Sequence, residues 1–233
     1  MIRERITTKN ALLLIALAAP WQVWAQSTGS AYPRMAPINQ YMMTPDAEIA
    51  MAKSAAPASI SHDAEIMVLE KQGYKTAVKG TNGFLCMVMR SWAAGTDAPE
   101  FWNPKARSPI CFNPPAIESY LPLLIKKTEW VLAGRSQAQM ADSIKAAFDK
   151  KEFTVPAPSA MGYMMSKEGH LNDSDGHWHP HIMFYVPKID LSAWGAGRAA
   201  SPVFGFQEVP TPVTVFAIPV SKWSDGSDAS HMK

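Results

Sequence analysis

The stretch that decides the fold class is residues 65–89, which read EIMVLEKQGYKTAVKGTNGFLCMVM. Two runs rich in Val, Ile, Leu and Met lie on either side of a third run, YKTAV, and turn residues separate them, first Gly73 and then the pair Asn82-Gly83. An Asn-Gly pair is a strong signal for a β-hairpin because both residues tolerate positive φ angles. The stretch therefore predicts an antiparallel meander of three strands, at residues 65–69, 74–78 and 84–89.

Two consecutive helices are predicted beyond a turn-rich segment. Asn113 is suited to cap the first helix, with Pro114 at its first position, and Gly134 ends it. Ser136 and Gln139 form a capping-box pattern at the start of the second helix. Strand patterns return at residues 161–166, 177–186 and 213–220. Strands on both sides of a helical pair are typical of an α+β domain, so we expect an antiparallel sheet packed against two consecutive helices.

The two ends of the chain differ from its middle. Residues 1–25 have the pattern of a signal peptide, with a positive leader, a short apolar run and a small-residue motif before Gln26. The apolar run has about nine residues, far fewer than the roughly 20 that cross a bilayer, so we expect no stable membrane anchor. The predicted location is the periplasm or the outside of the cell. Residues 26–45 are predicted as a flexible N-terminal arm, 46–223 as one α+β domain and 224–233 as a disordered tail.

Charge and motifs exclude several classes of partner. The chain has 22 Lys and Arg and 20 Asp and Glu, and loss of the leader would leave 19 of each. A nearly neutral mature chain lacks the excess of positive charge that is typical of nucleic-acid-binding proteins. The sequence also lacks a phosphate-binding Walker loop, a dinucleotide-binding glycine motif and a haem attachment motif. The partner we expect is a small-molecule ligand or substrate, and the oligomeric state stays open.

The two cysteines of the chain are Cys86 and Cys111. An even number of cysteines in an exported protein favours a disulfide over free thiols. Closing a loop of about 26 residues would stabilise the fold by on the order of 3 kcal/mol, because the cross-link lowers the conformational entropy of the unfolded chain.

Three histidines, His177, His179 and His181, lie in one predicted strand and would share one face. Trp178 and Ile182 would then face the core. Alternate residues of a strand start about 6.6 Å apart, so a single ion could be shared by His179 and one neighbour but hardly by all three. The sequence thus predicts a divalent metal site, with the alternative that the imidazoles are simply exposed to solvent.

A metal ion bound by two histidines needs at least one further ligand, and such an ion could take part in catalysis. Glu168 is the candidate for a third ligand or a general base, and three ligands with an open position would suit zinc-dependent hydrolysis. Copper is the alternative metal, because thioether and imidazole ligands suit it. The methionines near the histidines are Met161, Met164, Met165 and Met183.

The rival hypothesis is a metal-free binding or structural module of the periplasm, with an unknown ligand. Its contact surface would be the loop from Ser91 to Pro115, which holds Trp92, Phe101 and Trp102. Aromatic side chains bury large areas when they pack, so this loop is predicted to be ordered and to form the wall of a pocket.

Overall fold

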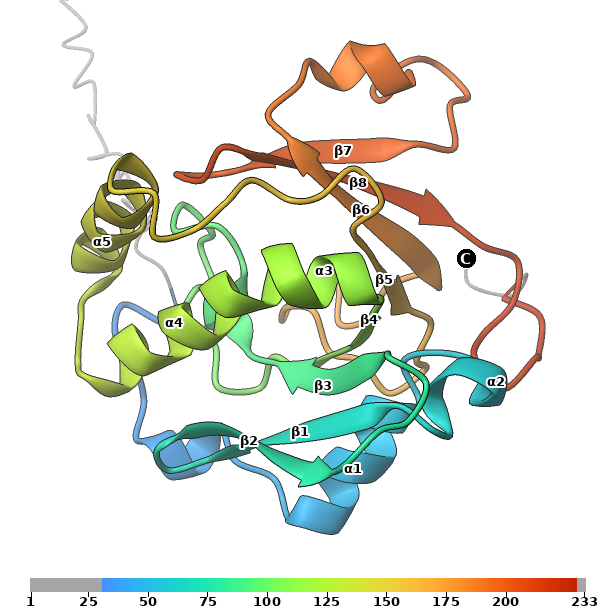
Figure 1. The fold of residues 1–233 in the computed structure, drawn as a ribbon, viewed down its shortest axis with the longest axis horizontal. Helices are drawn as coiled ribbons and strands as arrows, with labels where there is room; N and C mark the ends of the chain where they lie inside the picture. Colours follow the sequence, from blue (N-terminus) through green and yellow to red (C-terminus); the bar gives the residue numbers. More distant parts are fainter. Residues whose placement is uncertain (1–30, 230–233) are drawn as a thin grey trace, which may run out of the picture.

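The computed structural model describes residues 31–229, and its centre is one sheet of eight strands (Figure 1). The strands are β1 (Glu65–Glu70), β2 (Gly73–Val78), β3 (Leu85–Met89), β4 (Ser108–Phe112), β5 (Met161–Met164), β6 (His181–Pro187), β7 (Phe204–Glu208) and β8 (Val213–Pro219). Their order across the sheet is β2-β1-β3-β4-β5-β6-β8-β7.

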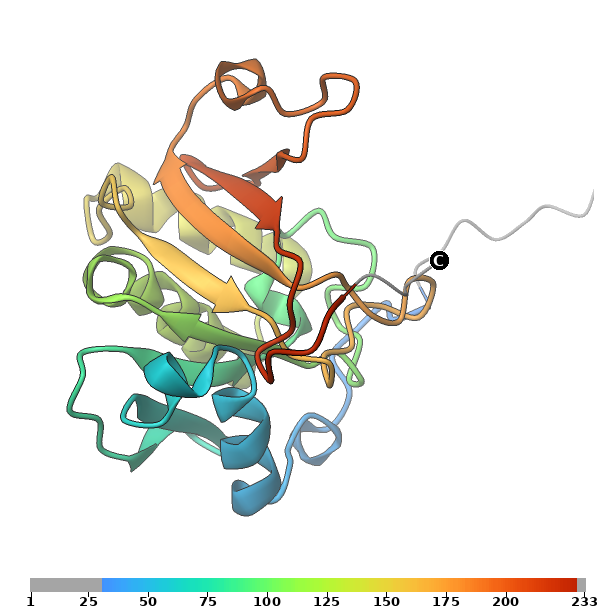
Figure 2. The same cartoon turned by 90° about the vertical axis from the view of Figure 1, so that its right-hand side faces the viewer.

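Within the described residues, helices lie before the first strand and between later strands. The α-helices are α1 (Pro45–Lys53), α2 (Ala58–Ser61), α3 (Pro114–Ser119), α4 (Leu121–Leu132) and α5 (Gln137–Asp149). Three short 3-10 helices are η1 (Ile38–Gln40), η2 (Ser91–Ala93) and η3 (Leu191–Trp194). Figure 2 shows α1 and the group α3–α5 on opposite sides of the strands. The mixture of a sheet with helices confirms the α+β class.

The sheet is mixed, not antiparallel as expected, because β3 pairs with β1 in parallel. The chain after β2 does not turn back at Asn82-Gly83. Instead Thr81 N donates to Asp63 O at 2.8 Å, so the loop crosses the end of β1 and delivers β3 to the other edge of that strand. A Cβ atom on Gly80 would lie 2.1 Å from Glu65 N, so this crossing requires glycine. The predicted meander is therefore wrong, although its three strands are present.

The predicted helix caps are found, but the first helix is divided. Asn113 Oδ1 accepts from Ala116 N at 3.1 Å, and Ser136 forms its capping box with Gln139. Between these caps the chain forms two helices, α3 and α4, which meet at Tyr120. Pro122 lies in the first turn of α4, where its missing N–H group is tolerated. Three helices, not two, therefore follow β4.

The strand β3 is buried on both of its faces. Leu85, Met87 and Met89 belong to the larger core, which also contains buried side chains of α3–α5. The same core includes Trp92, Phe101 and Trp102 from the segment between β3 and β4, called the aromatic loop below. Cys86 and Val88 point to a smaller core on the other face, which contains Ala52 of α1 and further alanines that follow this helix.

The predicted disulfide is confirmed. Cys86 and Cys111 are direct cross-strand partners in β3 and β4, and their sulfur atoms are bonded in the smaller core. The bridge thus joins two neighbouring strands toward the ends that lie away from the loop between them.

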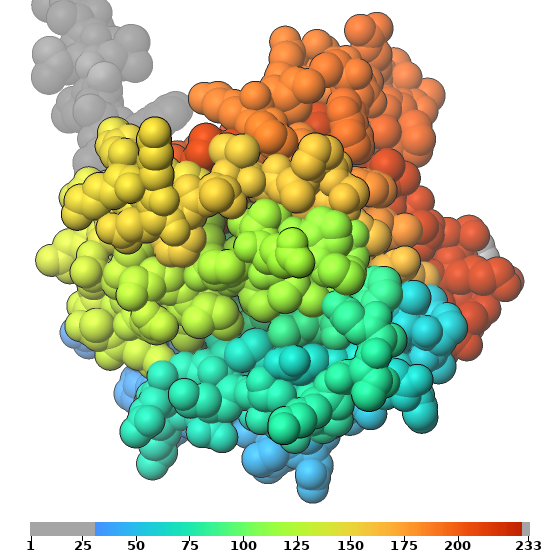
Figure 3. Space-filling model, viewed as in Figure 1, coloured from blue at the N-terminus to red at the C-terminus, as the bar shows by residue number. Residues whose placement is uncertain are grey.

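The predicted signal peptide, residues 1–25, lies outside the described residues, as do parts of the predicted arm and tail. Within the described part of the arm, Tyr41 is fully buried and donates to Trp102 O at 2.7 Å. Within the described part of the tail, Asp225 pairs with Lys167 at 2.7 Å. In residues 31–229, no helix has the length and apolar character to cross a membrane. Figure 3 shows α3–α5 covering the near face, with the segment around η3 projecting above them.

Candidate functional site

The strand that carries the histidines is shorter than predicted, because β6 begins at His181. The four residues before it follow a tight turn, in which Leu171 N donates to Gly176 O at 2.9 Å and His177 N to Asp175 O at 2.7 Å. Trp178 then packs so closely over Gly169 that a Cβ there would lie 2.2 Å from the ring. The three histidines therefore do not share one extended strand face.

Each histidine has a different environment. The ring of His177 is stacked on Trp223, with 5.1 Å between centroids and an angle of 2° between planes. His179 is exposed. The Nδ1 atom of His181 lies 2.7 Å from the backbone oxygen of His179, and burial lowers the pKa of His181 against a smaller opposing effect of that hydrogen bond.

The predicted partner Glu168 is exposed, and its backbone N donates to Ser166 Oγ at 3.0 Å. Across residues 31–229, no three His, Cys, Asp or Glu side chains are grouped as a metal ion would require. Metal binding through His177, His179 and His181 stays a prediction. Metal analysis of untagged protein checks it, because a site centred on His179 should lose its metal in His179→Ala.

The orientation predicted for the strand is wrong within β6. Tyr185 is buried and Met183 packs against the larger core. The face of β6 that meets the core is therefore the one that His181 shares with these two residues. Phe184, on the other face, packs against Trp194 of η3 with 5.7 Å between ring centroids. Because η3 covers that face only partly, Phe184 remains half-buried.

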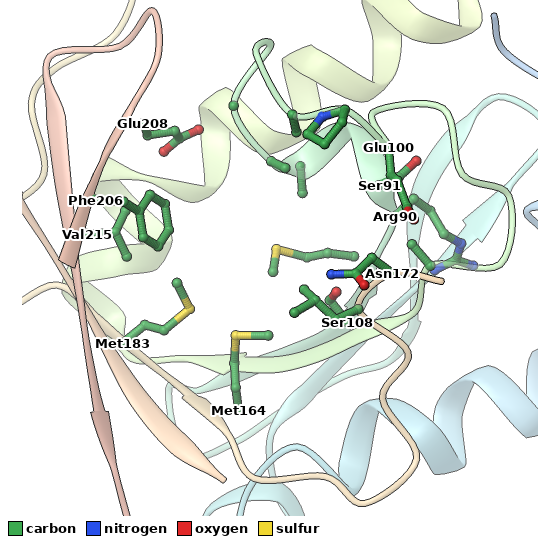
Figure 4. Close-up of a pocket in the computed structure, with 18 of the residues that line it drawn as sticks. Arg90, Ser91, Glu100, Ser108, Met164, Asn172, Met183, Phe206, Glu208 and Val215 are labelled. Carbon is green, nitrogen blue, oxygen red and sulfur yellow. The ribbon is translucent and has the colours of Figure 1, made fainter. Parts of the chain in front are cut away.

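A cavity of about 310 Å³ lies on the face of the sheet that meets the larger core (Figure 4). Strands β3–β8 each contribute to its floor, and residues 90–106 and 171–174 contribute to its opposite wall. The loop from Ser91, predicted as a pocket wall, thus lines the cavity with much of its length.

Most of the cavity surface is apolar. Figure 4 shows Met164 and Met183 pointing into the space from the sheet, with Phe206 and Val215 beside them. Met89, from the end of β3, also lines it. Thioether side chains are flexible and polarizable, so a wall with three methionines can adapt to ligands of different shape.

A buried ion pair lies at one corner of the cavity. Glu208 of β7 lines the cavity, and its Oε1 atom lies 3.3 Å from Lys127 Nζ, with the two side chains 2% and 1% exposed. Lys127 also donates to the carbonyls of Ala93 and Ala94, at 2.8 and 2.7 Å. Burial lowers the pKa of Lys127, and the negative charge of Glu208 opposes this effect. Lys127, a residue of α4, thus contacts both the aromatic loop and β7.

Two stacked tyrosines border the same corner. The rings of Tyr120 and Tyr185 are 4.0 Å apart at their centroids and nearly parallel, and Tyr120 donates to Glu208 Oε2 at 2.8 Å. Burial raises the pKa of both hydroxyl groups well above the ordinary value, and the nearby Glu208 charge adds to the effect. Both tyrosines are therefore neutral at physiological pH.

The opposite rim is a polar network between the aromatic loop and the turn at residues 171–176. Glu100 accepts hydrogen bonds from Asn103 Nδ2 at 2.6 Å and from Asp173 N at 3.1 Å. The Asp173 carboxylate accepts from Tyr32 at 2.5 Å and from Lys105 at 3.1 Å. These two partners, the tyrosine first, lower the pKa of Asp173 to about 2.

One polar atom of the cavity wall has no protein partner. Ser91 lines the cavity and is 9% exposed, and its Oγ atom is buried without a hydrogen bond to any group of the described residues. An unpaired buried hydroxyl costs free energy, so such a group is a candidate for contact with a ligand or water.

Sequence reasoning missed the residues at the two polar ends of the cavity. Lys127 and Glu208 are 81 positions apart, and no local pattern relates them. A buried lysine could have been suspected only because Lys127 lies among the apolar positions of its helix. Ser91 was identified only as the start of the loop.

Comparisons with known proteins add no relative. A scan against protein-family models, a search of curated proteins and a search of solved structures each found no match for the chain. The geometry of the site is therefore the basis for assigning a function.

Proposed function

We propose that this protein is an exported binding module that holds a small, predominantly apolar molecule in the cavity between the sheet and the aromatic loop. The observation that carries the proposal is the cavity itself, about 310 Å³ in volume, with a wall of Met, Phe and Val side chains and a few polar groups at its ends. Ligand sites in proteins have this character, mostly apolar with a small number of placed polar groups.

The size of the cavity limits the ligand. A cavity of on the order of 150 Å³ lined by apolar side chains accepts benzene. The present cavity has about twice that volume, so a bicyclic aromatic or a short branched aliphatic molecule fits its scale.

Binding is a better match than catalysis for the groups around this cavity. Lys127 and Glu208 are paired with each other, and Glu208 also holds the Tyr120 hydroxyl. A general base or nucleophile needs a free position beside the reacting atom, whereas these groups hold the loop in place. Export is supported by the leader pattern of residues 1–25 and by the disulfide, which is compatible with an oxidising compartment.

Thermal unfolding with a neutral bicyclic probe, naphthylmethanol, tests the proposal. A ligand that binds only the native state at 100 times its dissociation constant adds about 2.7 kcal/mol, which is roughly 5 to 10 °C for a domain of this size. Ala98→Leu introduces a larger side chain at the half-buried lining residue Ala98 and should abolish the shift. The matched control is Ala141→Leu, at a half-buried position of α5 that is not among the cavity residues. Equal shifts in the two variants would contradict the proposal.

A further inference from the structure

We infer that the cavity selects ligands whose polar group is a cation or a hydrogen-bond donor and discriminates against carboxylates. This inference rests on the proposed function and adds the chemical class of the ligand. It follows from which charges around the cavity are already neutralised and which are not.

Lys127 is not available to an anionic ligand. Its three ammonium protons are used by Ala93 O, Ala94 O and Glu208 Oε1, at 2.8, 2.7 and 3.3 Å. An ammonium group has three donors, so none remains for a carboxylate in the cavity. Together Lys127 and Glu208 present a neutral pair at that corner.

Arg90 lines the cavity, but its guanidinium group is directed elsewhere. Nε donates to Tyr41 O at 2.7 Å, Nη2 to Glu48 Oε1 at 2.8 Å, and Nη1 to Val88 O. The side chain is fully buried, and Figure 4 shows its end turned away from the open space. This arginine therefore supports the loop and offers no charge to a ligand.

The other cations of the loop are also engaged. Arg107 donates to the carbonyls of Pro104 and Ala106, at 2.7 and 2.8 Å. Lys105 lies 3.1 Å from Asp173 and forms an ion pair with it on the outer rim. Neither residue is part of the cavity lining.

Glu100 lines the cavity without a cationic partner among the described residues, unlike Glu208, which is paired with Lys127. Its oxygens accept from Asn103 Nδ2 and from Asp173 N, which are both neutral donors. The side chain is half-buried and lines the cavity, so it presents a negative charge at this end. A carboxylate ligand would be repelled here, whereas an ammonium group would be attracted.

Ser91 supplies the matching neutral contact. Its buried Oγ atom has no partner within the described residues, and Ser91 lines the same cavity as Glu100. The hydroxyl can accept a hydrogen bond from an ammonium or hydroxyl group. The cavity lining thus combines an acceptor with a negative charge.

Three probes with the same apolar body and different head groups test this selectivity. Dissociation constants are measured for naphthylmethylamine, naphthylmethanol and naphthoate with the full protein. We expect the amine to bind at least about fivefold more tightly than the carboxylate, the ratio that corresponds to an ion-pair effect of about 1 kcal/mol at a partly exposed site. Glu100→Gln should reduce this ratio to within about twofold. Glu129→Gln, in an exposed pair with Lys126 on α4, is the matched control and should leave the ratio as in the wild type.

The outcomes separate this inference from the proposed function. Naphthoate binding as tightly as the amine, or an undiminished ratio in Glu100→Gln, would overturn the inference while the cavity remained a binding site. If none of the three probes binds, the proposed function fails and the inference fails with it. Should Glu100→Gln not fold, the salt dependence of the wild-type ratio decides, since screening must lower a ratio of electrostatic origin.

Discussion

The buried pair of Lys127 and Glu208 makes a strong prediction about stability, because the two side chains are 1% and 2% exposed. In Glu208→Gln the ammonium group keeps its two carbonyl acceptors but loses its counter-charge. In Lys127→Met the Glu208 carboxylate keeps the Tyr120 hydroxyl at 2.8 Å and loses its cation. Each single substitution therefore leaves one charge buried without compensation, whereas the double substitution removes both.

The expected magnitudes follow from this asymmetry. Removing one partner of a buried pair costs about 3 to 5 kcal/mol, while replacing both partners is often close to neutral. For a domain of 150 to 250 residues, 1 kcal/mol shifts the melting temperature by about 2 to 4 °C. Each single variant should therefore melt roughly 10 °C below the wild type, and the double variant should recover most of the loss.

Denaturant unfolding of the wild type, the two single variants and the double variant gives the coupling energy directly. The control is the exposed pair Lys126 and Glu129 on the same helix, at 2.8 Å, whose coupling should be below about 1 kcal/mol. A coupling energy for Lys127 and Glu208 no larger than that of the control would refute the role given to the buried pair. So would single variants as stable as the wild type.

Three further predictions concern the disulfide, the buried tyrosines and Ser91. Replacing both Cys86 and Cys111 by alanine should lower the free energy of unfolding by about 3.5 kcal/mol, the loop-entropy value for a separation of 25 residues, and a loss below about 1 kcal/mol would contradict it. Burial raises the pKa of Tyr74 to about 12, so the native state keeps a proton that the unfolded state loses above about pH 10. The contribution of Tyr74 to the free energy of unfolding is fully present below about pH 10 and should fall by about 1.4 kcal/mol per pH unit as the pH approaches 12. Denaturant unfolding at several pH values should find a smaller slope in Tyr74→Phe. Ser91→Ala should leave the free energy of unfolding unchanged or raise it by up to about 1 kcal/mol, because the hydroxyl has no protein partner among the described residues. Thr128→Val, which removes the acceptor 3.0 Å from Trp92 Nε1, should lower it by about 1 to 3 kcal/mol. Equal losses in the two variants would show that the Ser91 hydroxyl has a stabilising partner.

Local patterns in the sequence predicted the parts of the fold that local interactions determine. The capping box at Ser136, the cap at Asn113 and the strands around residues 65–89 are each specified by a few neighbouring residues. The strand β4 was missed because Pro109 interrupts it, and proline rarely lies within a central strand. The disulfide across β3 and β4 followed from the number of cysteines.

Contacts between distant segments determine the remainder, and no local pattern contains them. The parallel pairing of β3 with β1 is accompanied by a hydrogen bond from Thr81 to Asp63, across the end of β1. The histidine strand was given the wrong length because the turn before it and the contact of Trp178 with Gly169 are tertiary features. The cavity joins residues from Met89 to Val215, so only the aromatic loop could be recognised in advance as one of its walls.

A crystal structure of the protein soaked with a brominated naphthylmethanol would show directly whether the cavity is the binding site. We expect an anomalous bromine peak inside the cavity, in contact with the side chains of Met183, Met89 and Phe206. The hydroxyl group of the probe should lie within hydrogen-bond distance of Ser91 Oγ or Glu100. A peak only on the outer surface, with the cavity holding water in the presence of saturating probe, would contradict the claim that this cavity is the binding site.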